Sequence, residues 1–292
     1  MITVNTISGG KTSAYIAANY SADYNVFALV RTNDKNCLFP DAKVRQIVSD
    51  KLGTEFIGTL EEDTIIYTIL DLEQFIGKKI NWVTGLTFDE AIKKEAGWLP
   101  NKLHRYCTKH VKMSPMFNFW RENINVPCEF RIGFRANEMR RAISLNEKLN
   151  KNGFLEQKAI IGKSKNGTRN KWGLIEWQKP SFPLIQDAIF KDTVEEFWKG
   201  KPVRFAYMNN CIGCFHRNEL LLKLMSEKHP NKFQWFIDQE KGRNSKDTWK
   251  SNGHITYEKI KQHKLQLELF EDDFNECDSG YGHGNAATDC TR

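Results

Sequence analysis

Apolar residues follow two different spacings in the first sixty residues, and the two spacings alternate. Short apolar runs at 2–7 and 25–30 indicate buried strands, whereas 12–20 and 41–52 have the pattern of helices. A further short run at 55–57 predicts a third strand. Strands that alternate with helices are typical of a parallel sheet with helices on both of its faces.

The remainder of the chain continues this alternation. We predict helices at 87–97 and 111–123, a strand at 129–134, and helices near 192–199 and 216–227. The polar stretch 148–172 contains two Asn-Gly pairs and therefore predicts a loop or an insertion.

These elements predict an α/β fold built on a doubly wound, mostly parallel sheet with helices on both faces. We expect a larger domain at 1–200, which contains a basic insertion at about 145–172, and a smaller, helical, cysteine-bearing region at 201–292. No segment of the sequence repeats another.

The composition is that of an ordinary globular protein. Of the 292 residues, 40% are hydrophobic and 27% are charged, which excludes wholesale disorder. No apolar run approaches the roughly 18 residues that cross a bilayer, and residues 1–5 do not resemble a secretory signal. Seven unevenly spaced cysteines do not suit a disulfide scaffold, so we expect a cytoplasmic protein whose thiols serve metal or redox chemistry.

The net charge of +7 is concentrated in one segment. Residues 139–171 carry nine basic and two acidic side chains, an excess equal to that of the whole chain. Such a surface attracts anions, including nucleic acid, although a solvated lysine-rich loop has the same composition. Both interpretations stay open at the level of sequence.

A glycine-rich turn follows the first predicted strand and reads Ser8, Gly9, Gly10, Lys11, Thr12, Ser13. Two glycines let successive N–H groups curl around an anion, and the helix that follows adds free N–H groups and its positive dipole end. The turn therefore predicts a phosphate or pyrophosphate site at the carboxyl edge of the sheet. A tightly capped helix start without a ligand is the alternative.

The turn is not a P-loop, because that motif needs a glycine where this chain has Asn5. Its Ser-Gly-Gly-x-x-Ser pattern resembles the first loop of the pyrophosphate-loop, or adenine nucleotide alpha-hydrolase-like, proteins. Many members that cleave ATP carry Asp at the fifth loop position, where this chain has Thr12. The resemblance implies an adenine nucleotide (ATP, adenylyl sulfate or phosphoadenylyl sulfate) with its phosphates on residues 8–13.

Residues 107–115 resemble the Cys-Cys-x-x-(Arg/Lys)-Lys-x-x-Pro element of adenylyl-sulfate and phosphoadenylyl-sulfate reductases. Cys107 matches the first cysteine, Thr108 replaces the second, and Lys112 and Pro115 match the lysine and the proline. The chain thus resembles the phosphoadenosine phosphosulfate reductase-like proteins of phages and mobile elements.

A second segment, 133–141, resembles the Gly-x-Arg-x-x-Glu-x-x-Arg element of the same family. An arginine at the end of a strand offers a planar fork for phosphate or sulfate, so we expect Arg135 and Arg140 to contact the nucleotide. A surface cluster of ion pairs around Glu138 is the alternative. The resemblance implies catalytic roles for Arg135 and Lys112, and it places Asn33 in a turn near the nucleotide.

Cys211 and Cys214 form a Cys-x-x-Cys pair, which serves redox, zinc and iron–sulfur chemistry in different proteins. The reductase resemblance places Cys107 against this pair and favours Cys277 as a fourth ligand. His216, His283 and Cys290 are the substitutes for that fourth position. Thiolate ligands favour a 4Fe–4S cluster or zinc over hard metals.

Cys277 also has a competing interpretation as a catalytic nucleophile. It follows Glu276, as the C-terminal cysteine of thiol-dependent phosphoadenylyl-sulfate reductases follows a glutamate, although Asp278 replaces the next glycine. The resemblance as a whole implies an enzyme that acts on a sulfonucleotide or an adenylate, with a reductant such as thioredoxin. An ATP-dependent sulfurtransferase acting on nucleic acid and a catalytically inactive nucleotide-binding module are the alternatives.

Overall fold

The computed structural model describes residues 1–102, 104–164, 166–243, 247–250 and 255–263. A six-stranded sheet lies at its centre in the order β5-β2-β1-β6-β8-β7. Its strands are β1 (Thr3–Ile7), β2 (Tyr24–Leu29), β5 (Ile80–Thr84), β6 (Cys128–Arg131), β7 (Leu155–Lys163) and β8 (Asn170–Ser181). All neighbours run parallel except β7, which pairs antiparallel with β8 at the edge. The predicted fold class is confirmed.

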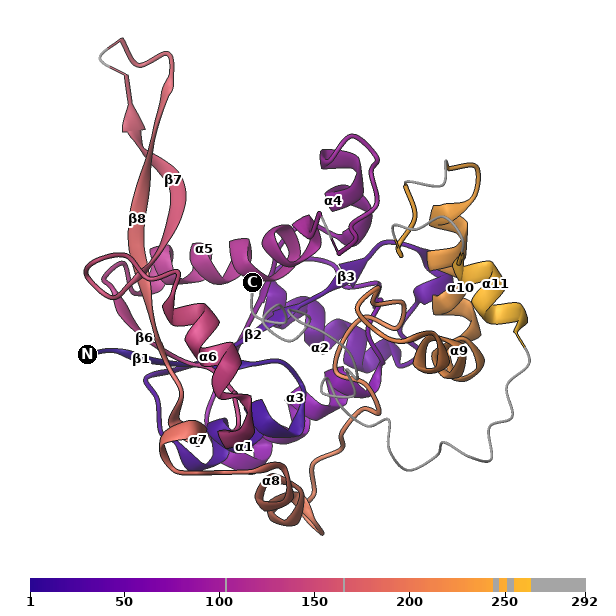
Figure 1. Ribbon diagram of the computed structural model, residues 1–292, viewed down its shortest axis with the longest axis horizontal. Helices are drawn as coiled ribbons and strands as arrows, with labels where there is room; N and C mark the ends of the chain where they lie inside the picture. Colours follow the sequence, from indigo (N-terminus) through magenta and orange to yellow (C-terminus); the bar gives the residue numbers. More distant parts are fainter. Residues whose placement is uncertain (103, 165, 244–246, 251–254, 264–292) are drawn as a thin grey trace.

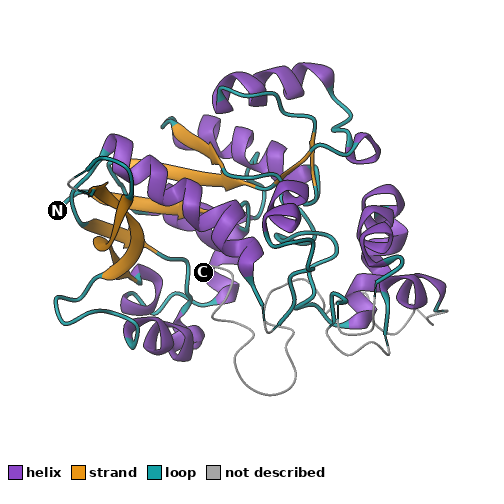
Figure 2. Ribbon diagram, turned by 90° about the horizontal axis from the view of Figure 1, so that it is seen from above, coloured by secondary structure: helices purple, strands orange, loops and turns teal. Residues whose placement is uncertain are grey.

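Helices lie on both sides of this sheet (Figure 2). The α-helices are α1 (Lys11–Asn19), α2 (Ala42–Leu52), α3 (Thr64–Ile76), α4 (Phe88–Lys94), α5 (Ser114–Asn123), α6 (Met139–Asn146), α7 (Pro183–Gln186), α8 (Lys191–Trp198), α9 (Glu219–Lys228), α10 (Pro230–Glu240) and α11 (Tyr257–Gln262). Two short 3-10 turns, η1 (Lys35–Cys37) and η3 (Ala136–Glu138), and a π-helical turn, η2 (Thr108–Met113), complete the set. Within the described residues, no helix has the length and apolar character that a membrane crossing needs.

Successive side chains of the strands belong alternately to two apolar clusters, one on each face of the sheet. Val26 belongs to the cluster beneath α5, whereas the next residue, Phe27, belongs to the cluster beneath α1 and α3. Period-two alternation in a doubly covered sheet produces this division. The central strands of the sheet are therefore covered by helices on both faces.

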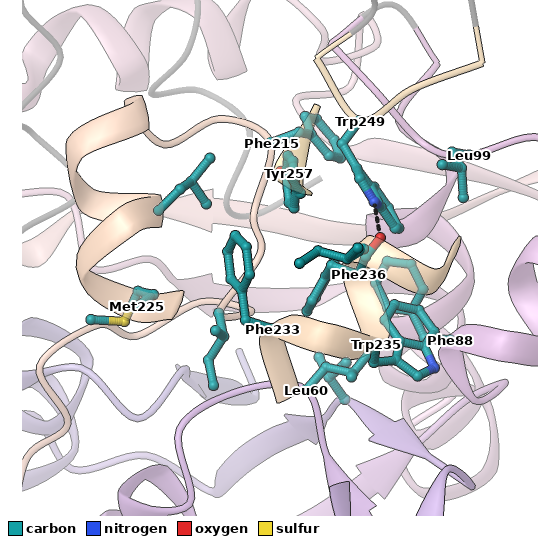
Figure 3. Close-up of a cluster of buried hydrophobic side chains, with 14 of the residues drawn as sticks. Leu60, Phe88, Leu99, Phe215, Met225, Phe233, Trp235, Phe236, Trp249 and Tyr257 are labelled. Atoms are coloured by element: carbon teal, nitrogen blue, oxygen red, sulfur yellow. Dashed lines mark hydrogen bonds between the residues drawn. The ribbon is translucent and has the colours of Figure 1, made fainter. Parts of the chain in front are cut away.

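A third apolar cluster joins the C-terminal helices to the rest of the chain (Figure 3). Phe233 and Phe236 of α10 pack in it with Phe88 of α4, and Trp249 donates a hydrogen bond from Nε1 to the Phe236 carbonyl at 2.9 Å. Residues on both sides of the domain boundary predicted at residue 200 thus share one core. Part of the 201–292 region, 264–292, lies outside the described residues.

Two local predictions were wrong. Residues 55–57 do not form a strand: the short β4 (Gly58–Thr59) follows them and pairs antiparallel with β3 (Arg31–Thr32). The third parallel strand is β5, whose five residues gave no strong sequence signal. The polar stretch 148–172 is largely a β-hairpin, because its second Asn-Gly pair forms the turn between two strands, with Gly167 at a φ of 69°.

The strand order reverses at the centre of the sheet. The chain leaves β1 through α1 toward β2 on one side, whereas β6 lies on the other side of β1. In open α/β sheets the loops diverge at such a point and leave a crevice outside the carboxyl ends of the two strands. The glycine-rich turn follows β1 and the 133–141 segment follows β6, so both predicted anion-binding segments lie at this crevice.

Candidate functional site

The turn after β1 is held in shape by its own polar groups. Ser13 accepts a hydrogen bond from the Ser8 N–H at 3.1 Å and donates one to the Gly10 carbonyl at 3.0 Å. Gly10 caps α1 and makes no side-chain capping bond. The first N–H groups of α1 are therefore left for a ligand, as an anion site at a helix start requires.

Gly9 is required by its backbone conformation, and Gly10 is closely approached by a side chain. Gly9 has a φ of 81°, and a Cβ placed on it would lie 2.7 Å from Cγ2 of Ile65 on α3. A Cβ on Gly10 would lie 2.5 Å from Nδ2 of Asn209. The first contact is with a buried side chain and the second is with an amide that lines the same cavity, so the turn fits closely between α3 and the 205–210 segment.

The segment after β6 carries a buried cluster of two arginines around one carboxylate. Arg135 donates from Nε to Oε2 of Glu138 at 3.0 Å, and Arg141 donates to Oε1 of the same residue. The Arg141 guanidinium also lies 4.2 Å from the centre of the Phe134 ring. The single carboxylate orients two guanidinium groups at the cavity, and a guanidinium offers a planar fork to an anionic ligand.

The third segment that contributes to the site is the π-helical turn η2. Such turns are rare and occur often at functional sites, because the wider turn redirects side chains. Gly85 makes room for this turn, since a Cβ there would lie 2.3 Å from the His110 carbonyl oxygen. Within η2, Lys112 contacts Oε1 of the buried Glu61 at 3.0 Å.

These three segments enclose a cavity of about 460 Å³. Its apolar part is formed by Val26, Ala28, Phe130, Ile132 and Trp177 of the sheet together with Met113 and Met116. Its polar part is formed by the glycine turn, Lys112, Arg135, Arg141 and Glu195. An apolar pocket with converging charged groups at one end is suited to a ligand with a flat base and an anionic tail.

Gln178, on β8 at the cavity wall, is the most informative polar residue of the apolar part. It is only 5% exposed, and among the described residues no group makes a hydrogen bond with its buried Oε1. A buried acceptor without a partner costs free energy, and a ligand that offered an N–H or O–H there would recover it.

Most of the predicted nucleotide-binding residues meet at this cavity. The residues that line it are Ser8, Gly10, Lys11, Thr12, Ser13, Lys112 and Arg135. Gly9 lies behind the turn, against Ile65. Lys11 forms an ion pair with Glu195 of α8. Two predicted residues are exposed and lie outside the lining formed by the described residues: Asn33 and Arg140. The second arginine at the cavity is Arg141, because α6 turns Arg140 toward solvent.

The cysteine pair lies directly beside the cavity. Asn210 lines the cavity and precedes Cys211, and Thr108 lines it and follows Cys107. Cys211 also forms an isolated β-bridge with Glu61, the partner of Lys112. The predicted approach of Cys107 to the pair agrees with the electrostatics, since a neighbouring Cys214 contributes to the raised pKa of Cys107.

The turn of this pair is anchored in the C-terminal core. Gly213 packs against Phe236, where a Cβ would lie 2.4 Å from the ring, and its carbonyl accepts a hydrogen bond from the Tyr257 hydroxyl at 3.0 Å. Burial raises the pKa of the Cys107 thiol to about 11 and that of Cys211 well above its ordinary value. Both thiols are therefore protonated at neutral pH unless a cation stabilises the thiolate.

The donor atoms near the cysteine pair include the His216 imidazole as well as the thiols. Burial, with positive charge from Arg105, lowers the pKa of His216 to about 3, and both of its ring nitrogens are buried without a hydrogen-bond partner among the described residues. A neutral imidazole and thiols are the donor types that zinc and iron–sulfur clusters prefer. However, no three His, Cys, Asp or Glu side chains in the described segments are arranged to hold a metal ion. Cys277, the favoured fourth ligand, lies outside the described residues, as do His283 and Cys290.

Comparisons with family models, with curated proteins and with solved structures found no match to this chain. The fold and the cavity are therefore the grounds on which a function is argued. Three cavity residues had escaped sequence reasoning: Gln178, Glu195 and Arg141. Gln178 and Glu195 lie on elements far along the chain from the motifs, whereas Arg141 is part of the second motif and differs from Arg140 only in the direction in which the helix points it.

Proposed function

We propose that this chain is an enzyme of the phosphoadenosine phosphosulfate reductase-like type, which binds an adenine nucleotide in the cavity between β1 and β6. One observation carries the proposal: the glycine turn, Arg135 and Lys112 line one cavity at the reversal of strand order, beside Cys107 and Cys211. The sequence predicted each of these groups separately, and their common location at one cavity supports the proposal independently.

The anionic end of the nucleotide would lie on the turn after β1. The free N–H groups at the start of α1 face this end of the cavity, and the helix dipole favours negative charge there. Lys11 would exchange Glu195 for a phosphate oxygen. Arg135 would offer its planar fork to the α-phosphate or to the sulfate, and it would stabilise the charge that develops there during attack.

The base would occupy the apolar part of the cavity, against β2 and β6. Adenine has an exocyclic amino group, which donates, next to a ring nitrogen, which accepts. The amide of Gln178 offers the complementary acceptor and donor, and its Oε1 has no partner among the described residues. We therefore propose that Gln178 contacts the base and favours adenine over guanine.

The reacting end would face the cysteine side of the cavity. In the proposed reaction a thiol reductant such as thioredoxin supplies two electrons, the bond between sulfur and the phosphate oxygen breaks, and sulfite and a nucleoside monophosphate or bisphosphate are released. Lys112 would neutralise the departing anion. A zinc ion or 4Fe–4S cluster would be held by Cys107, Cys211, Cys214 and a fourth group such as Cys277, and when bound it would keep these thiols in their thiolate form.

Product analysis tests the proposal. The full chain, purified without oxygen, would be incubated with adenylyl sulfate, with phosphoadenylyl sulfate or with ATP, in the presence of reduced thioredoxin. We expect sulfite and an equal amount of AMP or adenosine bisphosphate, and we expect Arg135→Lys, which keeps the charge but loses the planar fork, to slow their release more than it weakens binding. Nucleotide binding without any product would contradict the enzyme and leave the inactive binding module.

The basic hairpin favours a second candidate function. Transfer of sulfur to a nucleic acid would begin with activation of the acceptor by ATP, and it would release AMP and pyrophosphate instead of sulfite. Residues 155–181 form a basic hairpin whose root lines the cavity, which is where a polymeric acceptor would need to be held. Release of pyrophosphate that depends on added nucleic acid would favour this candidate over sulfonucleotide reduction.

A further inference from the structure

The hairpin of β7 and β8 leaves the body of the protein and projects into solvent (Figure 1). β8 pairs with β6 through residues 178–181 and with β7 through most of its length. Most of the hairpin is therefore a two-stranded ribbon. A ribbon of this kind has little apolar core of its own, so a function at its surface is the natural reason for its length.

The charge of the outer part of the ribbon, which excludes Glu156 and Glu176 at its base, has one sign. Residues 157–175 carry five basic side chains and no acidic one. Four of these bases belong to the described residues and are exposed: Lys158, Lys163, Arg169 and Lys171. Within the described part of the chain none of the four takes part in an ion pair, in contrast to Lys11, Arg135 and Lys112 in the cavity. Four solvated cations on a narrow ribbon form a site for a polyanion.

The ribbon also displays apolar side chains between these charges. Trp172 is 56% exposed and Leu174 is 64% exposed. The register pairs Lys158 with Leu174 and Ile160 with Trp172, so all four side chains belong to the same face. An exposed indole on the face that carries Lys158 offers a surface on which an unpaired base can stack, while Lys171, next to Trp172 in β8, belongs to the opposite face.

The order of these groups along the ribbon separates a nucleic acid from a membrane as its partner. A segment that enters a lipid surface has apolar residues at its tip and basic residues behind them. Here the tip residues Ser164, Asn166, Thr168 and Arg169 are polar, and Trp172 and Leu174 lie behind them on the side of the ribbon. A polynucleotide on the face of Trp172 would contact the indole and Lys158 together, and Lys171 would hold phosphates that pass over the edge of this narrow ribbon.

We propose that the β7–β8 ribbon is a nucleic-acid-binding arm that holds a single-stranded polynucleotide. Phosphates would lie on Lys158, Lys163, Arg169 and Lys171, and an unpaired base would stack on Trp172. The strand that bears Trp172 reaches the cavity wall at Trp177, about 17 Å away at roughly 3.3 Å per residue. The arm does not depend on which reaction the cavity performs.

The charge contribution is tested by fluorescence anisotropy of a labelled single-stranded 15-mer against the full chain at several salt concentrations. We expect K163A/R169A/K171A to bind at least about tenfold more weakly and to lower the salt dependence of the logarithm of affinity by about 2. The matched control K43A/K93A/K199A removes three exposed charges from other surfaces and should retain most of the affinity. Equal loss in both variants would overturn the proposal.

The stacking contribution is tested with Trp172→Ala, for which we expect a loss of about fivefold or more. Trp98→Ala, which removes another half-exposed indole outside the ribbon, should leave the affinity unchanged. No binding of the 15-mer at low salt, tighter binding of a duplex of equal length, or preference for phosphatidylserine vesicles would each overturn the proposal. A nucleotide titration of the same variants separates this result from the proposed function, because the arm variants should bind nucleotide as the parent chain does.

Discussion

The two halves of the candidate site differ in whether their polar groups have partners within the protein. On the cavity side each charge has a protein partner: Lys11 pairs with Glu195, Lys112 with Glu61, and Arg135 with Glu138. On the cysteine side, burial keeps Cys211 protonated and His216 neutral, and the His216 nitrogens have no partner among the described residues. The charged groups of the first half are paired within the protein, whereas the second half has donors of the type that a soft cation prefers.

This difference predicts two kinds of response to ligands. A nucleotide must exchange existing ion pairs for new ones, so its affinity depends on how easily each pair opens. A metal ion would bind donors that are poorly solvated, so its removal should lower the free energy of unfolding of the region around the cysteine pair.

The largest effect should come from the cysteine pair. We expect Cys211→Ala to lose nearly all bound zinc or iron, measured by elemental analysis of protein purified without oxygen. Cys128→Ala is the matched control, because Cys128 is fully buried in the cluster beneath α5, away from the pair. Equal metal content in the two variants, or none in the parent chain, would refute the metal centre and leave the cavity proposal standing.

The glycine turn should show the next largest effect. Gly9→Ala forces an alanine into a φ of 81° and places its Cβ against Ile65, at a cost of about 1–3 kcal/mol for the strain alone. We expect nucleotide affinity, measured by calorimetry, to fall at least about tenfold. Gly77→Ala imposes a similar strain at a φ of 60° in open space, so it should lower thermal stability and keep the affinity.

A substitution of Gln178 tests which part of the cavity binds the base. Replacing Gln178 with leucine removes the buried acceptor and keeps the volume, and we expect the preference for an adenine over a guanine nucleotide to shrink by about tenfold. The chain should be no less stable without ligand, because the lost oxygen has no hydrogen-bond partner among the described residues. An unchanged preference would remove Gln178 from the base-binding part of the cavity.

The smallest effect concerns the ion pair that a phosphate would open. Glu195→Gln releases Lys11, and because both side chains are more than a third exposed we expect nucleotide affinity to rise by no more than about fivefold. Glu196→Gln, at an exposed neighbouring position, removes the same charge away from Lys11 and should change the affinity less. A fall in affinity for the Glu195 variant would show that Glu195 binds the ligand itself.

The sequence was sufficient for those parts of the site that depend on local backbone geometry. Two adjacent glycines between a strand and a helix, and an arginine just after a strand, fix where their groups lie relative to the sheet edge. The spacing of apolar residues did not predict the β-hairpin within 148–172, because the pairing of β7 with β8 depends on register across the turn and not on a run of apolar residues. The sequence could not indicate Gln178, since only the three-dimensional structure shows that its oxygen is buried and has no partner among the described residues.

The central claim is that the cavity between β1 and β6 binds the anionic tail and the base of an adenine nucleotide. Isothermal titration calorimetry of the full chain with adenylyl sulfate, phosphoadenylyl sulfate and ATP, with GTP as the competitor, tests it most directly. The account predicts saturable binding of at least one adenine nucleotide at one site per chain, with GTP clearly weaker. No heat of binding with any of the three, or equal binding of GTP, would contradict it.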